Sequence, residues 1–185
     1  LGVNCYQWVL SYVSVICGTG VVVPMDKEPS ADDLAKLVVK SDVSAIILSK
    51  GYIKTVEQML PNCPGFKTCI VMEESDGPMP EGWHTIPRLV QYGMKLMSQG
   101  ERCFIDAQID DQCLSEILFT SGTTGANKGV MLSHHNIMTV VHSAMCLINP
   151  GQISFSVLLI NHTYECSCHI LGGMYAGITV CFSDS

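Results

Sequence analysis

Apolar positions in the first seventy residues alternate between the spacing of helices and the spacing of strands. Residues 6–16 and 53–60 carry apolar side chains at intervals of three and four, which predicts helices. Residues 21–23, 43–48 and 68–72 are short apolar runs rich in β-branched side chains, which predicts strands. Helices and strands in alternation are typical of a layered, doubly wound α/β fold with a mostly parallel sheet.

A further helix is expected to begin at Ser30. Asp33 follows three positions later, and this spacing is that of a capping box. Leu34, Leu37 and Val38 then fall on one face of the helix, so we expect them to form its buried stripe.

The pattern is less regular in the middle of the chain. Residues 73–82 are acidic and rich in Gly and Pro, which favours a surface loop. Residues 88–98 are periodic as in a helix, and Gly100 suits a left-handed cap at its end. Asp106, with Asp110 and Asp111, is expected in an irregular, solvated segment.

In the last third the same two spacings return. A helix is expected over residues 133–148 with Ser133 as its cap, and a strand over 153–160. Residues 162–176 are expected to be mostly helical, and residues 178–182 to form the final strand.

The composition favours a piece of a larger domain. Charged residues make up 15% of the 185 residues, against about 25% in an average soluble protein. Mean hydropathy is +0.31, yet the longest apolar stretch, residues 8–23, is broken by Gly18 and Gly20 and is too short to span a membrane. We therefore interpret residues 1–185 as the inner part of a larger α/β domain that is cut at both ends.

Charge and cysteine content exclude other classes. The net charge of −7 argues against nucleic acid as a partner, since no basic stripe is present to replace counterions. The ten cysteines mostly lie in apolar contexts as small hydrophobic residues, and we expect a cytoplasmic protein. Cys166 and Cys168 lie near His162 and His169 but lack the spacing of a zinc site.

The segment 119–129 carries the most specific chemistry. It combines three Gly and four Ser or Thr residues with one cation, Lys128, between the apolar runs 117–119 and 130–132. A strand–loop–strand hairpin of this composition offers many backbone N–H groups and hydroxyls to a polyphosphate. It is not a Walker loop, because the glycines do not open a helix and Gly129 follows the lysine. The alternative is a plain turn that binds nothing.

The chain resembles the adenylate-forming (AMP-binding) superfamily, and within it the long-chain fatty acyl-CoA synthetases. Residues 120–130, Thr-Ser-Gly-Thr-Thr-Gly-Ala-Asn-Lys-Gly-Val, are similar to the phosphate-binding signature of that family, and residues 131–137 continue the similarity. Asn161-His162-Thr163-Tyr164-Glu165 resembles its His-Thr-Tyr-Glu segment, and residues 18–26 its Gly-rich strand. The resemblance implies that residues 1–185 are part of the N-terminal domain of such an enzyme, without its C-terminal domain.

The resemblance also implies the roles of individual residues. Lys128 and His162 would be the catalytic residues, and His162 with Thr163 would lie beside the adenylate and the entrance to the acyl pocket. Thr120 would contact magnesium as well as nucleotide. The full set of implied nucleotide-binding residues is Thr120, Ser121, Gly122, Thr123, Thr124, Gly125, Lys128, His162 and Thr163.

Two positions depart from the family pattern. Asn127 replaces the usual proline before the lysine, which frees the backbone and restores an N–H donor. Asn161 stands where the long-chain branch often has a second histidine. The family's later magnesium glutamate, ribose aspartate and C-terminal lysine are not found before Ser185, so we expect residues 1–185 alone to be inactive.

The expected activity is that of an ATP-dependent ligase that uses Mg²⁺, activates a carboxylate as acyl-adenylate and transfers it to CoA. A fatty acid is the first expectation for the carboxylic acid, and an aryl or amino acid is the alternative. A non-catalytic nucleotide-binding module also stays open, as does peripheral membrane association of the full enzyme. A dinucleotide-binding domain is disfavoured, because no G-x-G-x-x-G opens a helix.

Overall fold

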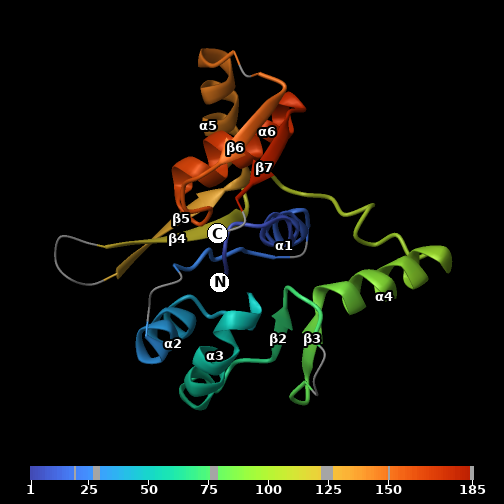
Figure 1. Ribbon diagram of the computed structural model, residues 1–185, viewed down its shortest axis with the longest axis vertical. Helices are drawn as coiled ribbons and strands as arrows, with labels where there is room; N and C mark the ends of the chain where they lie inside the picture. The colour runs from blue at the N-terminus through green and yellow to red at the C-terminus, as the bar shows by residue number, and fades with distance from the viewer. Residues whose placement is uncertain (19, 27–29, 76–78, 122–126, 150, 184–185) are drawn as a thin grey trace. The chain divides into compact units, whose positions relative to one another are not determined.

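The computed structural model describes residues 1–18, 20–26, 30–75, 79–121, 127–149 and 151–183. The chain forms two compact units. The first unit comprises Leu1–Gly2 and Asp26–Ala107, and the second comprises Val3–Met25 and Gln108–Ser185. Figure 1 shows that both units mix helices and strands, as the sequence predicts for an α/β fold.

The first unit contains a three-stranded parallel sheet in the order β1–β2–β3. Two of its strands, β1 (Ala45–Leu48) and β2 (Thr68–Val71), confirm the predicted apolar runs. The third, β3 (Trp83–Thr85), is not evident from the sequence, because its three residues lack an apolar run. Parallel pairing nevertheless brings Val71 opposite Thr85.

Helices connect the strands of this sheet. α2 (Ala31–Lys40) precedes β1, and α3 (Ile53–Met59), flanked by the short 3₁₀ turns η1 (Lys50–Tyr52) and η2 (Leu60–Asn62), joins β1 to β2. The predicted cap of α2 is confirmed, since the Asp33 backbone N–H donates to the Ser30 hydroxyl at 3.2 Å.

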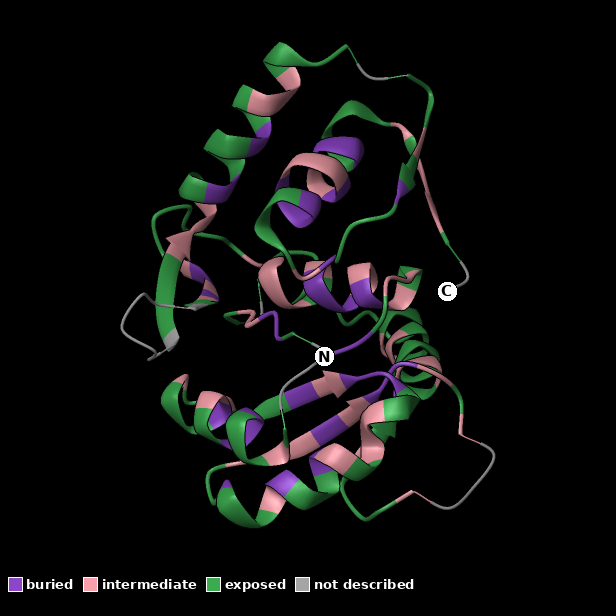
Figure 2. Cartoon of the chain, turned by 60° about the vertical axis from the view of Figure 1, so that its left-hand side comes forward, coloured by how far each residue is buried: buried purple, intermediate pink, exposed green. Residues whose placement is uncertain are grey.

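The core of the first unit lies between α2, α3 and the sheet. Buried residues, purple in Figure 2, occupy one face of each helix and alternate positions of β1 and β2. Those that lie at or near zero exposure are Leu34, Val38, Leu48, Val56, Met59, Cys69 and Val71. The predicted stripe of α2 is therefore confirmed at two of its three positions, and Leu37 is only half-buried.

Helix α4 (Ile86–Ser98) starts two residues earlier than the sequence pattern indicates. The Thr85 hydroxyl accepts a hydrogen bond from the Arg88 backbone N–H at 3.4 Å, so Thr85 is its cap. After the helix, Gly100 takes a φ of 91°, which confirms the expected left-handed residue.

The second unit begins with α1 (Tyr6–Ile16) and continues with an antiparallel hairpin, β4 (Leu114–Ser121) and β5 (Asn127–Ser133). Helix α5 (His134–Leu147) follows β5 without a break. The predicted strand at 21–23 is wrong in extent. Only Val22 pairs, in a single parallel bridge with Glu116.

The C-terminal part of the second unit is a β–helix–β crossover. β6 (Ile153–Ser156) pairs in parallel with β7 (Thr179–Phe182), and the π-helix η3 (Tyr164–Leu171) with the short helix α6 (Gly172–Ala176) connects them. β6 is shorter than the strand predicted over 153–160. Beyond Ser156, the Leu158 carbonyl and the Ile160 N–H bond to the Asn4 side chain instead of to a neighbouring strand.

Gly172 marks a close approach inside this unit. A Cβ atom at this position would lie 2.7 Å from the Met145 methyl group on α5. Glycine thus lets the crossover pack against α5. No helix in the described part of the chain is long and apolar enough to cross a membrane.

Candidate functional site

The hairpin places two of the predicted site residues opposite one another. Thr120 pairs with Lys128, and Ser121 pairs with Asn127 at the last described rung of the ladder. Thr120 and Lys128 are both exposed, and no described residue forms an ion pair with Lys128. The predicted residues Gly122, Thr123, Thr124 and Gly125 lie outside the described residues. The two strands of the strand–loop–strand interpretation are confirmed.

Packing on β4 fixes the hairpin from one side. The Val22 backbone N–H donates to the Ser115 carbonyl and the Ile117 N–H donates to the Val22 carbonyl, both at 2.9 Å. A Cβ at Gly129 would lie 3.0 Å from the Ile117 side chain. The glycine after the lysine therefore permits tight cross-strand packing next to Lys128.

Glu116 is a buried carboxyl at the base of the hairpin, and sequence reasoning missed it. Its side chain is 2% exposed, and burial raises the pKa of Glu116 to about 7. The Tyr12 hydroxyl is buried beside Glu116 and Cys166, and among the described residues it has no partner at hydrogen-bond geometry. Burial likewise raises the pKa of Cys166 to about 12. The Tyr12 hydroxyl of α1, the Glu116 carboxyl of β4 and the Cys166 thiol of η3 thus meet in the core. No local sequence motif predicts this arrangement.

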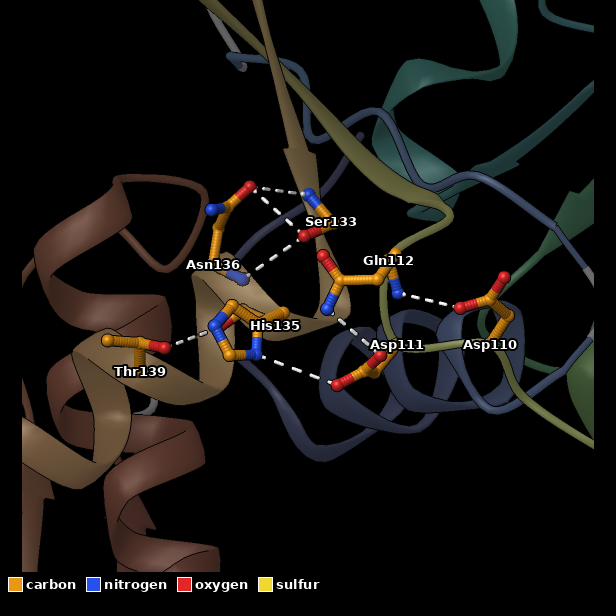
Figure 3. Close-up of polar contacts among 7 residues, drawn as sticks. All are labelled: Asp110, Asp111, Gln112, Ser133, His135, Asn136 and Thr139. Atoms are coloured by element: carbon orange, nitrogen blue, oxygen red, sulfur yellow. Dashed lines mark hydrogen bonds and ion pairs between the residues drawn. The ribbon is translucent and has the colours of Figure 1, made fainter.

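The start of α5 is held by a capping box (Figure 3). The Asn136 backbone N–H donates to the Ser133 hydroxyl at 3.2 Å, and the Ser133 N–H donates to Asn136 Oδ1 at 3.0 Å. The predicted cap at Ser133 is confirmed. Because α5 contacts both hairpin strands and also η3 and α6, its fixed start connects the hairpin to the His162 segment.

The aspartates before the hairpin are exposed, as predicted, but they are ordered by local bonds. His135 donates its backbone N–H to the Asp111 carbonyl at 2.8 Å, and its ring lies 3.5 Å from the Asp111 carboxylate. Asp110 accepts the Gln112 backbone N–H at 2.9 Å. These contacts determine where the hairpin begins relative to α5.

His162 and Thr163 lie where the turn after β6 enters η3. Both side chains are exposed, whereas Glu165 two positions later is buried. The His162 backbone N–H donates to the Leu159 carbonyl at 2.9 Å, and its carbonyl accepts the Cys166 N–H at 3.0 Å. The backbone of His162 is therefore fixed while its ring faces solvent, which is the arrangement a ligand-contacting side chain needs.

The described part of the chain has a shallow depression of about 370 Å³ along α5. Of the predicted site residues that the structure describes, none lines this depression. Its lining residues are Asp111, His134, His135, Met138, Thr139, His142 and Ser143.

Comparisons with known proteins find relatives in the family whose phosphate-binding signature the hairpin resembles. The chain is 26% identical over 193 residues to the long-chain-fatty-acid–CoA ligase ACSBG1 of Mus musculus, covering 100% of this chain and 26% of that protein. It is 27% identical to the peroxisomal long chain acyl-CoA synthetase 7 of Arabidopsis thaliana, covering 97% of this chain. The chain thus spans about a quarter of the length of the curated relatives it matches.

Solved structures share the fold. A coronafacic acid ligase from Pectobacterium brasiliense superposes with a TM-score of 0.78 at 16% identity, over 99% of this chain and 34% of that one. A red-emitting luciferase from Phrixothrix hirtus gives a TM-score of 0.80 at 13% identity, over 98% of this chain and 35% of that one. The model of the AMP-binding enzyme family matches residues 1–185. The chain belongs to the AMP-binding enzyme family.

Proposed function

We propose that residues 1–185 are part of the N-terminal domain of a longer ATP- and Mg²⁺-dependent acid–CoA ligase, and that its acid is a fatty acid. The observation that carries the proposal is the hairpin, in which the exposed Thr120 pairs with the exposed Lys128 beside the Gly/Thr segment. The fatty-acid assignment is supported by the relatives, whose names are those of long-chain ligases.

The apolar residues on β6 and just after it fit an assignment to a larger domain. Ile153, Phe155 and Val157 are 71%, 54% and 70% exposed in the second unit. Alternate apolar residues on a strand are usually buried against another layer. We propose that another part of the longer protein covers them.

The reaction joins a carboxylate to the α-phosphate of ATP and expels pyrophosphate. Two anions must meet and the negative charge of the leaving group must be neutralised, so positioning and electrostatics dominate. Lys128 supplies a compact cation at the hairpin, where no described side chain competes for it. The exposed Thr120 hydroxyl fits a hard cation, and bound magnesium would supply further neutralisation of the phosphates. His162 would contact the acyl end of the adenylate before CoA accepts the acyl group.

The test is ATP–pyrophosphate exchange by the longer enzyme with palmitate, benzoate and leucine as separate acids. We expect exchange with palmitate to exceed that with the other two. Lys128→Ala should reduce the palmitate rate by about 100-fold or more, as loss of a charge-stabilising group does. Lys128→Arg, which keeps the charge, should retain more activity.

Thermal unfolding of the same variants provides the control. Lys128 is exposed, so its replacement should leave the melting temperature within a few degrees of the wild type. Normal exchange by Lys128→Ala would overturn the nucleotide-binding role of the hairpin. Stronger exchange with benzoate or leucine would overturn the fatty-acid assignment.

A further inference from the structure

Asn4, near the start of the chain, binds the turn that leads into His162. Its side-chain oxygen accepts the Ile160 backbone N–H at 3.1 Å, and its amide nitrogen donates to the Leu158 carbonyl. These two bonds satisfy the Ile160 N–H and the Leu158 carbonyl, which lie beyond the end of β6 and have no strand partner among the described residues. One side chain 154 to 156 positions away in sequence thereby fixes the shape of the turn.

The same amide group connects to a second anchor beyond His162. Asn4 Nδ2 donates to the Ser156 hydroxyl at 3.4 Å, and Ser156 in turn donates to Glu165 Oε1 at 2.5 Å. Ser156 has one hydroxyl hydrogen, which it donates to Glu165, so towards Asn4 its oxygen acts as the acceptor. Asn4 and Glu165 thus hold the chain on either side of residues 162 and 163.

Glu165 is fixed by a further neighbour on its own helix. His169 Nδ1 lies 2.8 Å from the same Glu165 oxygen, and His169 Nε2 lies 2.8 Å from the Ser154 hydroxyl. Glu165 is 2% exposed, and hydrogen bonds between partners that are kept out of water are strong and directional. The path Asn4–Ser156–Glu165–His169–Ser154 is therefore a continuous hydrogen-bonded network that holds the chain before and after the exposed His162 and Thr163.

We propose that Asn4 is a positioning residue for the ligase reaction, which sets the place of His162 through the 158–160 turn and, through Ser156, the place of Glu165. The inference rests on the proposed function, because it assigns His162 to the adenylate. A displacement of about 1 Å at a substrate-contacting group costs up to about 100-fold in rate. Asn4 itself needs no contact with substrate.

Hydrogen exchange tests the structural part without any activity. In Asn4→Ala the Ile160 N–H loses its acceptor, so exchange in the 157–166 segment should rise, with α2 and α3 unchanged. Asn62→Ala, at an exposed asparagine, is the matched control and should change neither region. Unchanged hydrogen exchange over 157–166 in Asn4→Ala would overturn the proposal, whether or not the wild-type enzyme has ligase activity.

Kinetics of the longer enzyme test the catalytic part. Asn4→Ala should lower kcat for palmitate by about tenfold or more while KM for ATP changes little, since the hairpin is untouched. Glu165→Gln, which keeps an acceptor for Ser156, should retain most of the kcat that Glu165→Ala loses. Wild-type activity with an unaffected Asn4→Ala variant would refute the positioning role and leave the proposed function standing. A wild-type enzyme without ATP–pyrophosphate exchange would instead refute the proposed function.

Discussion

Glu116 lies in an environment that differs from what its residue type suggests. Carboxylates prefer water, yet this one lies in the core beside the Tyr12 hydroxyl and the Cys166 thiol. Burial raises its pKa from the ordinary 4.5 to about 7. Between these two pH values the folded protein keeps the Glu116 proton, whereas the unfolded chain has released it. Glu116 therefore makes a contribution to stability that depends on pH.

We expect the contribution of Glu116 to the free energy of unfolding to fall as pH rises from about 4.5 to about 7 and to stay constant above that range. The total loss is on the order of 3 kcal/mol, because each pKa unit corresponds to about 1.4 kcal/mol. Glu116→Gln removes the titration, so its stability relative to the wild type should rise across the same window.

Denaturant unfolding at a series of pH values measures this difference. Glu57→Gln, at an exposed position of α3, controls for the loss of one carboxylate and should follow the wild-type curve. Wild-type and Glu116→Gln curves that run parallel throughout the window would contradict the prediction.

Helix α5 is the element on which both halves of the candidate site depend. It starts at the end of the hairpin and packs against η3 and α6. The position of its first turn therefore sets where the hairpin lies relative to η3. The start is specified locally, because Ser133 and Asn136 bind one another's backbone N–H groups. The sequence could predict this cap for that reason.

Loss of the cap is expected to cost about 1 kcal/mol of stability, since Ser133→Ala leaves the Asn136 N–H without its acceptor. Ser133→Asp keeps an acceptor and should restore most of it. Ser143→Ala, at an exposed position of the same helix, should change little. Chemical denaturation distinguishes these variants, and equal stability of Ser133→Ala and the wild type would show that the cap is dispensable.

At the scale of the whole molecule, the chain has a separate core in each of its two units. The first is centred on α2, α3 and the parallel sheet, with Leu34 fully buried. The second lies among α1, β4, α5 and η3, where Tyr12, Val141 and Ile170 are buried. Contacts within each unit should make its stability largely its own.

Leu34→Ala is therefore expected to raise hydrogen exchange in α2, α3, β1 and β2, while α5 and the hairpin keep their protection. Removing a buried leucine side chain costs about 2–5 kcal/mol. Val39→Ala, on the same helix but 59% exposed, is the matched control and should leave exchange unchanged. A uniform rise across both units would show that the chain unfolds as one.

The sequence by itself determined the features that short segments specify. These are the two strands expected around the apolar runs 117–119 and 130–132, the caps at Ser30 and Ser133 and the left-handed Gly100. All depend on neighbouring residues, and all are confirmed. The family followed from local motifs for the same reason. Apolar runs rich in β-branched residues also located β1 and β2.

Only the tertiary structure decided what depends on distant partners. β3 forms because it pairs with β2, and the strand predicted to reach Ile160 stops at Ser156 because Asn4 binds the next backbone groups. The burial of Glu116 beside Tyr12 and Cys166, and the network beneath His162, join residues up to 156 positions apart. Such contacts carry no local signature, because hydrogen bonding and desolvation depend on distance in space and not on distance along the chain.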